Sequence, residues 1–232
     1  MKLLWSSQEV NLLRINTLWF VAMVLLFSQV ESKTSAVVDQ PAAASSVRSI
    51  DFANFTYPWT EGLRDPHRGR QTFSLKNGEL PATRDAEGRV DGMGVYLSHV
   101  DYQDVTGDWR EDAIIVMSIL TGGSALPNLV YIYQWRANKP HLLWTFDTGD
   151  RADGGLRRIK AESGSLTIEL YGKGKLVGSN YYKADGMTGG ACCPTHFTRT
   201  HYKWNGRRFV RKGKSEILQN PEGHGSPVMN YS

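Results

Sequence analysis

The chain has 232 residues, with 27 Lys or Arg and 23 Asp or Glu, which gives a formal net charge of +4. Hydrophobic residues make up 41% of it, an ordinary globular mixture that excludes a wholly disordered chain and a collagen-like fibre. The length excludes a large multidomain enzyme and predicts one domain of ordinary size.

The first 32 residues are typical of an export signal. Lys2 and Arg14 precede an apolar run from Leu18 to Phe27, which has the length of a signal-peptide core and about half that of a membrane-spanning helix. Ser32 ends a short segment that suits cleavage, and the alternative is an uncleaved anchor. No later apolar run is long enough to cross a bilayer, so we expect a secreted or periplasmic protein with no membrane span in the mature chain.

The mature chain divides by composition into three parts. Residues 33–50 are rich in Ala, Ser and Val and predict a flexible tether, and residues 51–215 are expected to form a single β domain. Residues 216–232 turn polar and are expected to be a disordered tail. Closely spaced Gly and Pro residues follow residue 60, and no later segment supports a long helix.

Short apolar segments separated by turn residues predict strands from residue 95 onward. Residues 113–120 are apolar on both faces, which predicts a strand at the centre of a sheet. Asn205-Gly206 and Ser163-Gly164 predict hairpin turns. The expected strands are 95–100, 113–120, 129–135, 141–146, 157–161, 166–171, 197–204 and 209–212. They predict an all-β fold, an antiparallel meander that forms a two-layer sandwich or a partly closed barrel.

An acidic turn precedes the most apolar of these strands. Residues 104–112 read Asp-Val-Thr-Gly-Asp-Trp-Arg-Glu-Asp. Calcium takes six to eight oxygen ligands, and a tight loop supplies them from alternate side chains and a backbone carbonyl. The predicted metal ligands are Asp104, Thr106, Asp108, the carbonyl of Arg110, and Asp112. The alternative is an Asp-rich turn whose carboxylates accept hydrogen bonds from their own backbone amides.

The same turn resembles the calcium loop of the FG-GAP or integrin-α repeat, in which Asp-x-Asn-x-Asp-Gly-x-x-Asp precedes a strand. It departs from that pattern at two positions. Thr106 stands where the repeat has Asp or Asn, and Trp109 stands where the repeat has the Gly that supplies a positive φ. The chain has one such unit, so the resemblance implies the calcium-loop chemistry and not the propeller that those repeats build.

A second acidic turn lies between two later strands. Residues 147–155 read Asp-Thr-Gly-Asp-Arg-Ala-Asp-Gly-Gly, and Asp150, Arg151 and Asp153 are predicted to contact a ligand. Two or three carboxylates at this spacing suit a metal or a sugar. The alternative is a loop in which Arg151 neutralises its acidic neighbours.

The two cysteines, Cys192 and Cys193, are adjacent in the sequence. An oxidising compartment disfavours free exposed thiols, so we predict a vicinal disulfide that would stiffen a sharp turn and offer a flat platform to a ligand. The alternative is a pair of buried thiols. Together with His196, the cysteines complete the predicted ligand-binding residues.

The stretch from Asp101 to Phe209 is similar to a group of exported bacterial β domains of unknown function. They combine a Gly-Asp loop before a buried strand, a Gly-Asp-Arg-Ala-Asp-Gly-Gly turn, and a Cys-Cys-Pro near a closing Trp-x-Gly hairpin. The resemblance implies no activity, but it indicates the turn at residues 150–155 and the Cys-Cys-Pro turn as functional surface.

These features predict a binding or structural module of the cell envelope, whose partner is a glycan or an envelope protein bound with the help of calcium. Its surface would combine the acidic turns with the Cys-Cys-Pro loop. The alternative is a hydrolase of an envelope polymer, with two of four carboxylates roughly 5–9.5 Å apart as acid and base. Those four are Asp104, Asp108, Asp150 and Asp153.

A third possibility starts from residues 199–214, which carry seven basic side chains and no acidic one. Such a segment is either the solvated face of a hairpin or a surface that docks on an acidic partner. Nucleic acid is not the expected partner, because the chain carries an export signal.

Overall fold

The computed structural model describes residues 46–60, 71–121, 123–162, 164–178 and 194–221. All of them belong to the second of two compact units of the chain, Ala42–Ser232. The predicted signal peptide, Cys192 and Cys193 lie outside the described residues. None of the helices in the described ranges is long and apolar enough to cross a membrane.

The described residues form an all-β fold, as the sequence predicts. The elements are the 3-10 turns η1 (Val47–Ser49) and η2 (Phe52–Asn54) and the strands β1 (Thr56–Pro58), β2 (Thr72–Ser74), β3 (Glu79–Leu80), β4 (Gly94–Gln103), β5 (Asp112–Leu120), β6 (Asn128–Arg136), β7 (Lys139–Asp147), β8 (Leu156–Glu162), β9 (Ser165–Tyr171), β10 (His196–Trp204) and β11 (Phe209–Gln219). Every strand pairing is antiparallel.

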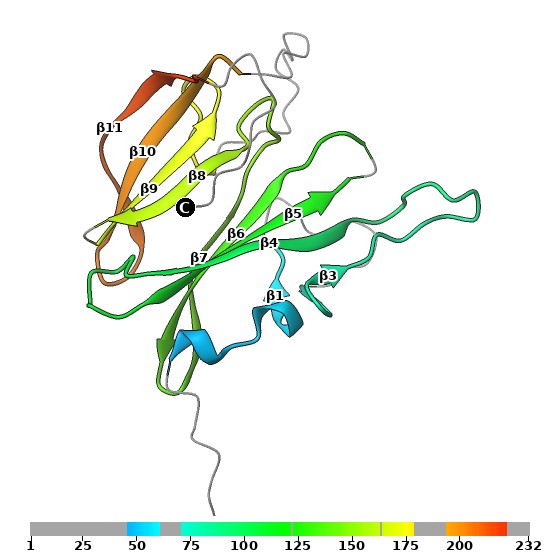
Figure 1. Cartoon of the computed structure of the whole chain (residues 1–232), viewed down its shortest axis with the longest axis horizontal. Coiled ribbons are helices and arrows are strands. Elements are labelled where there is room, and N and C mark those ends of the chain that lie inside the picture. The colour runs from blue at the N-terminus through cyan, green and yellow to red at the C-terminus, as the bar shows by residue number, and fades with distance from the viewer. Residues whose placement is uncertain (1–45, 61–70, 122, 163, 179–193, 222–232) are drawn as a thin grey trace, which may run out of the picture. The chain divides into compact units, whose positions relative to one another are not determined.

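The strands make two main sheets, and neither of them closes into a barrel (Figure 1). One sheet has the order β3-β4-β5-β6-β7, the other has the order β11-β10-β9-β8, and β1 pairs with β2 separately. An apolar cluster joins the two main sheets, because Ile114, Val130 and Phe146 of the first share it with Leu166 and Tyr202 of the second. Of the two predicted architectures, a two-layer sandwich and a partly closed barrel, the structure therefore has the sandwich.

The central position predicted for residues 113–120 is confirmed, because β5 is the middle strand of the five-stranded sheet. The side chains on its two faces belong to two different hydrophobic clusters. Ile114 packs between the sheets, whereas Ile115 packs against the N-terminal residues Phe52 and Tyr57. Successive side chains of a strand point to opposite faces, so a strand that is covered on both faces is apolar throughout.

The packed part of the chain extends beyond the predicted limits at both ends. Val47, which the sequence analysis placed in the tether, is 1% exposed and belongs to the core. Residue 215, the expected end of the domain, lies within β11, and Asn220 is buried with its Nδ2 donating to the carbonyl of Pro194 at 2.9 Å. Most side chains of β11 are exposed at the edge of the sheet, so its composition does not indicate a strand.

Antiparallel pairing sends successive connections to alternate ends of the strands. The loop at residues 104–111, the turn between β6 and β7 and the turn at 205–208 lie at one end, which we call the acidic-loop end. The β7–β8 connection at residues 148–155 and the start of β10 lie at the other, which we call the far end. A nine-residue strand separates the two ends by about 30 Å.

Candidate functional site

The acidic loop between β4 and β5 is closed by its own backbone. The carboxylate of Asp104 accepts hydrogen bonds from the amides of Gly107 at 2.6 Å, Asp108 at 3.2 Å and Trp109 at 2.9 Å. The positive φ expected at Trp109 is present, with φ +65, and its side chain is 95% exposed. The loop therefore has the local structure of an Asp-closed turn, the arrangement that the sequence offered as the alternative to a metal loop.

The loop also packs closely on the second sheet. Gly107 belongs to the acidic loop and Gly164 to the turn between β8 and β9, and both residues have positive φ. A Cβ atom on Gly164 would lie 2.9 Å from the Cα atom of Gly107. Real Cβ atoms do not approach backbone so closely, so Gly at residue 164 permits the contact. This contact fixes the acidic loop against the end of the four-stranded sheet.

Asp112, the first residue of β5, holds the base of the acidic loop. Its Oδ2 accepts hydrogen bonds from the amides of Val105 at 3.1 Å and Thr106 at 3.2 Å. Its Oδ1 is buried and has no hydrogen-bond partner. Burial raises the pKa of this carboxyl to about 7, because the ionised form loses its hydration in the interior. Asp112 is therefore the member of the loop with an unused buried acceptor.

The five predicted calcium ligands share this loop, but their side chains do not converge on one point. Asp108 accepts from the amide of Arg110 at 3.0 Å and from Nε2 of Gln134 at 3.0 Å. Within the ranges that the structure describes, no three His, Cys, Asp or Glu side chains form a group that could hold a metal. Asp112 Oδ1 is a buried oxygen of the predicted ligand set without a hydrogen-bond partner, and calcium binding itself stays a prediction.

A groove of about 260 Å³ opens beside the loop. It joins the acidic loop to the last residues of β6 and to the end of β10, and its lining residues are Thr106, Asp108, Arg110, Gln134, Trp135, Arg136 and Trp204. The ring of Trp204 contacts the ring of Phe209 with the centroids 5.1 Å apart. Trp135 packs against the apolar cluster on the other face of its sheet, which leaves Trp204 as the aromatic wall of the groove.

The two arginines of the groove, Arg110 and Arg136, are exposed, and neither forms an ion pair with another described residue. Sequence reasoning assigned Arg110 only a backbone role and missed Gln134, Arg136 and Trp204. Arg110 and Trp204 are 94 positions apart, so no local pattern in the sequence connects these residues with one another.

The second acidic turn lies at the far end of the strands. Asp150 Oδ1 accepts the amide of Ala152 at 2.5 Å, and the carboxylate of Asp153 pairs with Nζ of Lys175 at 2.6 Å. Arg151 is exposed and forms no ion pair within the described part of the chain. The neutralising cation is therefore Lys175, not Arg151 as the sequence suggested.

The single loop surface that the sequence predicted is not formed. Asp150 and Asp153 lie at the far end with His196, which begins β10, whereas Asp104 and Asp108 lie at the acidic-loop end. The intervening strands are about 30 Å long, so a catalytic pair with one carboxylate from each turn is excluded by distance. Cys192 and Cys193 lie outside the described residues.

A buried ionic cluster on the outer face of the four-stranded sheet was not predicted. Glu169 is 1% exposed although it alternates with Ile168 and Leu170, which face the other sheet. Its carboxylate accepts from Nε of Arg199 at 2.8 Å and from the guanidinium of Arg157. The guanidinium of Arg157 also lies 4.2 Å from the ring centroid of Phe197. A lone Glu within an alternating strand gives no sequence signal of such burial.

Comparison with known proteins adds no relative: no family model, no curated protein and no solved structure matches the chain. The fold and the groove thus define an antiparallel β sandwich with a polar groove at the acidic-loop end.

Proposed function

We propose that the chain is a binding module whose ligand is a glycan held in the groove beside the acidic loop. The observation that carries the proposal is the pairing of an aromatic wall, Trp204, with the side chains of Asp108, Gln134, Arg110 and Arg136. Sugar rings offer an apolar C–H face and a rim of hydroxyls, so they are bound by a flat aromatic ring together with planar polar groups.

Trp109 supports the same assignment. It stands between two lining residues of the groove, is 95% exposed, and adopts a positive φ that costs a non-Gly residue about 1 kcal/mol or more. A large exposed aromatic residue in a strained turn is typical of a surface that contacts a ligand. Trp109 therefore offers an exposed ring on the loop that borders the groove.

The place of action follows from the predicted export signal. Secretion or transfer to the periplasm would bring the groove to the glycans of the cell envelope and its surroundings. The sequence left two kinds of partner open, a glycan and an envelope protein. The size of the groove favours the glycan. At about 260 Å³ it suits one or two sugar units of a polymer better than a protein surface of standard size.

Calcium is the second part of the proposal. The residues that would hold it are Asp104, Thr106, Asp108, the carbonyl of Arg110, and Asp112, and the unpartnered buried Oδ1 of Asp112 is the observation that favours it. A bound calcium ion would supply positive charge that compensates the loop carboxylates. Because Asp108 belongs to both the loop and the groove, we expect calcium and glycan binding to be coupled.

The glycan proposal is tested by titrating the purified chain with a panel of soluble polysaccharides while following tryptophan fluorescence. We expect one or more polymers to bind, and Trp204→Ala to weaken that binding at least about fivefold, because stacking on an aromatic ring contributes roughly 1–3 kcal/mol. The matched control is Arg151→Ala, an exposed substitution at the far end that should leave affinity unchanged. Equal affinity of the Trp204→Ala variant and the parent would refute the groove as the binding site.

The calcium proposal has a readout of its own, the melting temperature with calcium and with chelator. Calcium at about 100 times its dissociation constant should stabilise the fold by about 2.7 kcal/mol, which corresponds to roughly 2–4 °C in a domain of this size. The shift should vanish in Asp108→Ala and persist in Asp150→Ala. A melting temperature that is the same with calcium and with chelator would remove calcium from the proposal and leave the glycan groove standing.

A further inference from the structure

We infer that the glycan is a polyanion, and that the turn between β10 and β11 is the surface that selects it. This inference rests on the proposed function, because the turn begins directly after Trp204, the aromatic wall of the groove. It names the chemical class of the ligand and adds residues outside the groove to the site.

The turn at residues 205–208 is held in one conformation by its own polar groups. Oδ1 of Asn205 accepts hydrogen bonds from the amides of Arg207 at 3.0 Å and Arg208 at 2.9 Å, and the amide of Asn205 donates to the carbonyl of Arg208 at 3.2 Å. Gly206 supplies the positive φ of the turn, at +90. The two guanidiniums therefore project from a fixed turn, which lowers the entropy cost of binding through them.

The strands that flank this turn carry further basic side chains. Six of them are exposed and form no ion pair with any described residue: Lys203, Arg207, Arg208, Arg211, Lys212 and Lys214. Arg199, farther along β10, is paired with Glu169 and Glu216 and is not part of this set. We call these six residues the basic hairpin. Arg110 and Arg136, at the same end of the strands, are two further exposed arginines that form no ion pair with another described residue.

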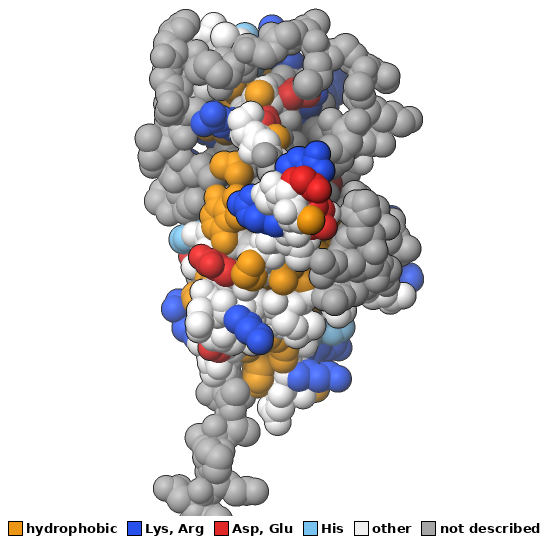
Figure 2. Space-filling view, turned by 90° about the vertical axis from the view of Figure 1, so that its right-hand side faces the viewer, with side chains coloured by type: hydrophobic (Ala, Val, Ile, Leu, Met, Phe, Trp, Pro, Cys, Tyr) orange, Lys and Arg blue, Asp and Glu red, His pale blue; other side chains and the backbone are white. Residues whose placement is uncertain are grey.

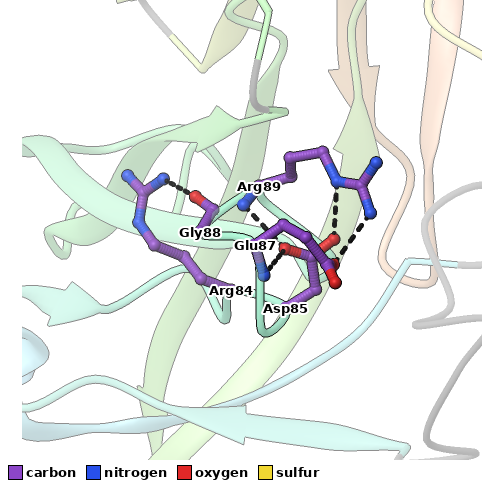
Figure 3. Close-up of polar contacts among 5 residues, drawn as sticks. All are labelled: Arg84, Asp85, Glu87, Gly88 and Arg89. Atoms are coloured by element: carbon purple, nitrogen blue, oxygen red, sulfur yellow. Dashed lines mark hydrogen bonds and ion pairs between the residues drawn. The ribbon is translucent and has the colours of Figure 1, made fainter.

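A charged loop elsewhere in the same chain shows that this excess is not a general property of its surface. In the loop between β3 and β4, Arg89 pairs with Asp85 at 2.8 Å and with Glu87 at 2.9 Å, and Arg84 donates to the carbonyl of Gly88 at 2.8 Å (Figure 3). Near the middle of the face shown in Figure 2, basic and acidic side chains lie next to each other. Among the described residues, the basic hairpin has no such acidic partners.

The geometry favours a polymer strand over a flat anionic surface. A groove of about 260 Å³ admits a narrow strand and not a flat bilayer, and its lining has one carboxylate, Asp108, against two arginines, Arg110 and Arg136. Carboxylate or sulfate groups that recur along a polymer are bound by guanidinium and ammonium groups, and Arg binds such groups with paired hydrogen bonds.

The test measures affinity for polygalacturonate and for heparin, each against its matched neutral form, methyl-esterified polygalacturonate and desulfated heparin. We expect at least one charged polymer to bind the purified chain, to bind at least tenfold more tightly than its neutral form, and to weaken as NaCl rises through the range in which the Debye length falls from about 10 Å to 3 Å. The double substitution Arg207→Gln/Arg208→Gln should weaken charged-polymer binding about tenfold, since two exposed ion pairs of up to about 1 kcal/mol each are lost.

The matched control is Arg84→Gln/Arg89→Gln, which removes the same number of arginines from the loop of Figure 3 and should leave affinity unchanged. Equal binding of charged and neutral polymers, with loss in Trp204→Ala, would overturn the polyanion and leave the glycan groove intact. Binding of neither charged polymer also overturns it. Equal binding of a DNA oligonucleotide or of anionic lipid vesicles, insensitive to Trp204→Ala, would show nonspecific attraction and overturn it as well.

Discussion

Two buried carboxylates, Glu169 and Asp112, differ in how completely they are bonded. Both oxygens of Glu169 accept from an arginine, Oε1 from Arg199 and Oε2 from Arg157. Asp112 has backbone donors on Oδ2 and none on Oδ1. A carboxylate whose acceptors are all used serves the fold, whereas one with a spare buried acceptor at a loop beside a groove retains the capacity to bind.

The largest expected effect is the loss of stability caused by the substitution Glu169→Gln. The substitution keeps the size of the side chain but removes the charge that balances Arg157, whose side chain is 17% exposed, and leaving a buried charge unpaired costs about 3–5 kcal/mol. Urea unfolding should show this as a lower midpoint with an unchanged slope. Glu162→Gln, which removes an exposed partner of Lys160 at the end of the adjacent strand β8, is the control and should change the midpoint little.

A cost for Glu169→Gln as small as that of Glu162→Gln would show that solvent reaches the cluster around Phe197. The contrast between Glu169 and Asp112 would then not hold, because Glu169 too would depend on water and not only on partners within the fold. Replacement of the whole ionic cluster by apolar residues of similar volume offers a second check, since it should restore part of the lost stability.

The next effect is a pH dependence that comes from Asp112 in the chelated protein. Its carboxyl has a pKa of about 7 in the folded state because of burial, against about 4 in the unfolded chain. Between these values the folded state binds more protons, so the free energy of unfolding should fall as pH rises from 4 to 7, by at most about 1.4 kcal/mol per unit. Below pH 4 this contribution is fully present, and above pH 7 it is lost.

Asp112→Asn isolates this contribution, because an amide does not titrate. Burial also raises the pKa of Asp147, which adds a slope of the same sign, so the quantity to compare is the difference in slope between parent and variant. Parallel curves of unfolding free energy against pH for the two proteins would place Asp112 in water, and its Oδ1 would no longer be a spare buried acceptor.

The fold was more predictable from the sequence than the site, and particular residues show why. Residues 113–120 predict a central strand because burial on both faces requires apolar side chains throughout. Asn205-Gly206 marks its hairpin because the turn needs positive φ. Trp204 and Gln134, in contrast, meet only when the two sheets pack, and the end of β11 is hidden by the polar side chains of an edge strand. The acidic loop was recognised, but its separation from Asp150 depends on strand topology.

A smaller effect is expected at Trp109. Trp109→Gly should raise stability by about 1 kcal/mol at most, because Gly adopts positive φ without a Cβ clash, while the greater freedom of Gly in the unfolded chain offsets part of the gain. Asn138→Gly, at φ +58, is the control and should gain less, since Asn tolerates this conformation better than Trp does. If Trp109 is a stacking ring of the groove, the same variant binds glycan more weakly.

A Trp109→Gly variant that is more stable and binds as well as the parent would remove Trp109 from the proposed site. A variant that is less stable would mean that the exposed ring contributes contacts to the fold. Measuring stability and binding on one preparation separates the two roles, because strain relief and loss of a stacking surface change the two quantities in opposite directions.

The smallest effect is expected at the loop of Figure 3, where the charges are balanced and exposed. Arg89→Gln removes two ion pairs, but the Arg89 side chain is 74% exposed and water solvates the freed carboxylates of Asp85 and Glu87. The unfolding midpoint should therefore barely move, and it should move less still at high salt. A midpoint change as large as that of Glu169→Gln would contradict the view that burial, and not the number of ion pairs, decides which charges this fold depends on.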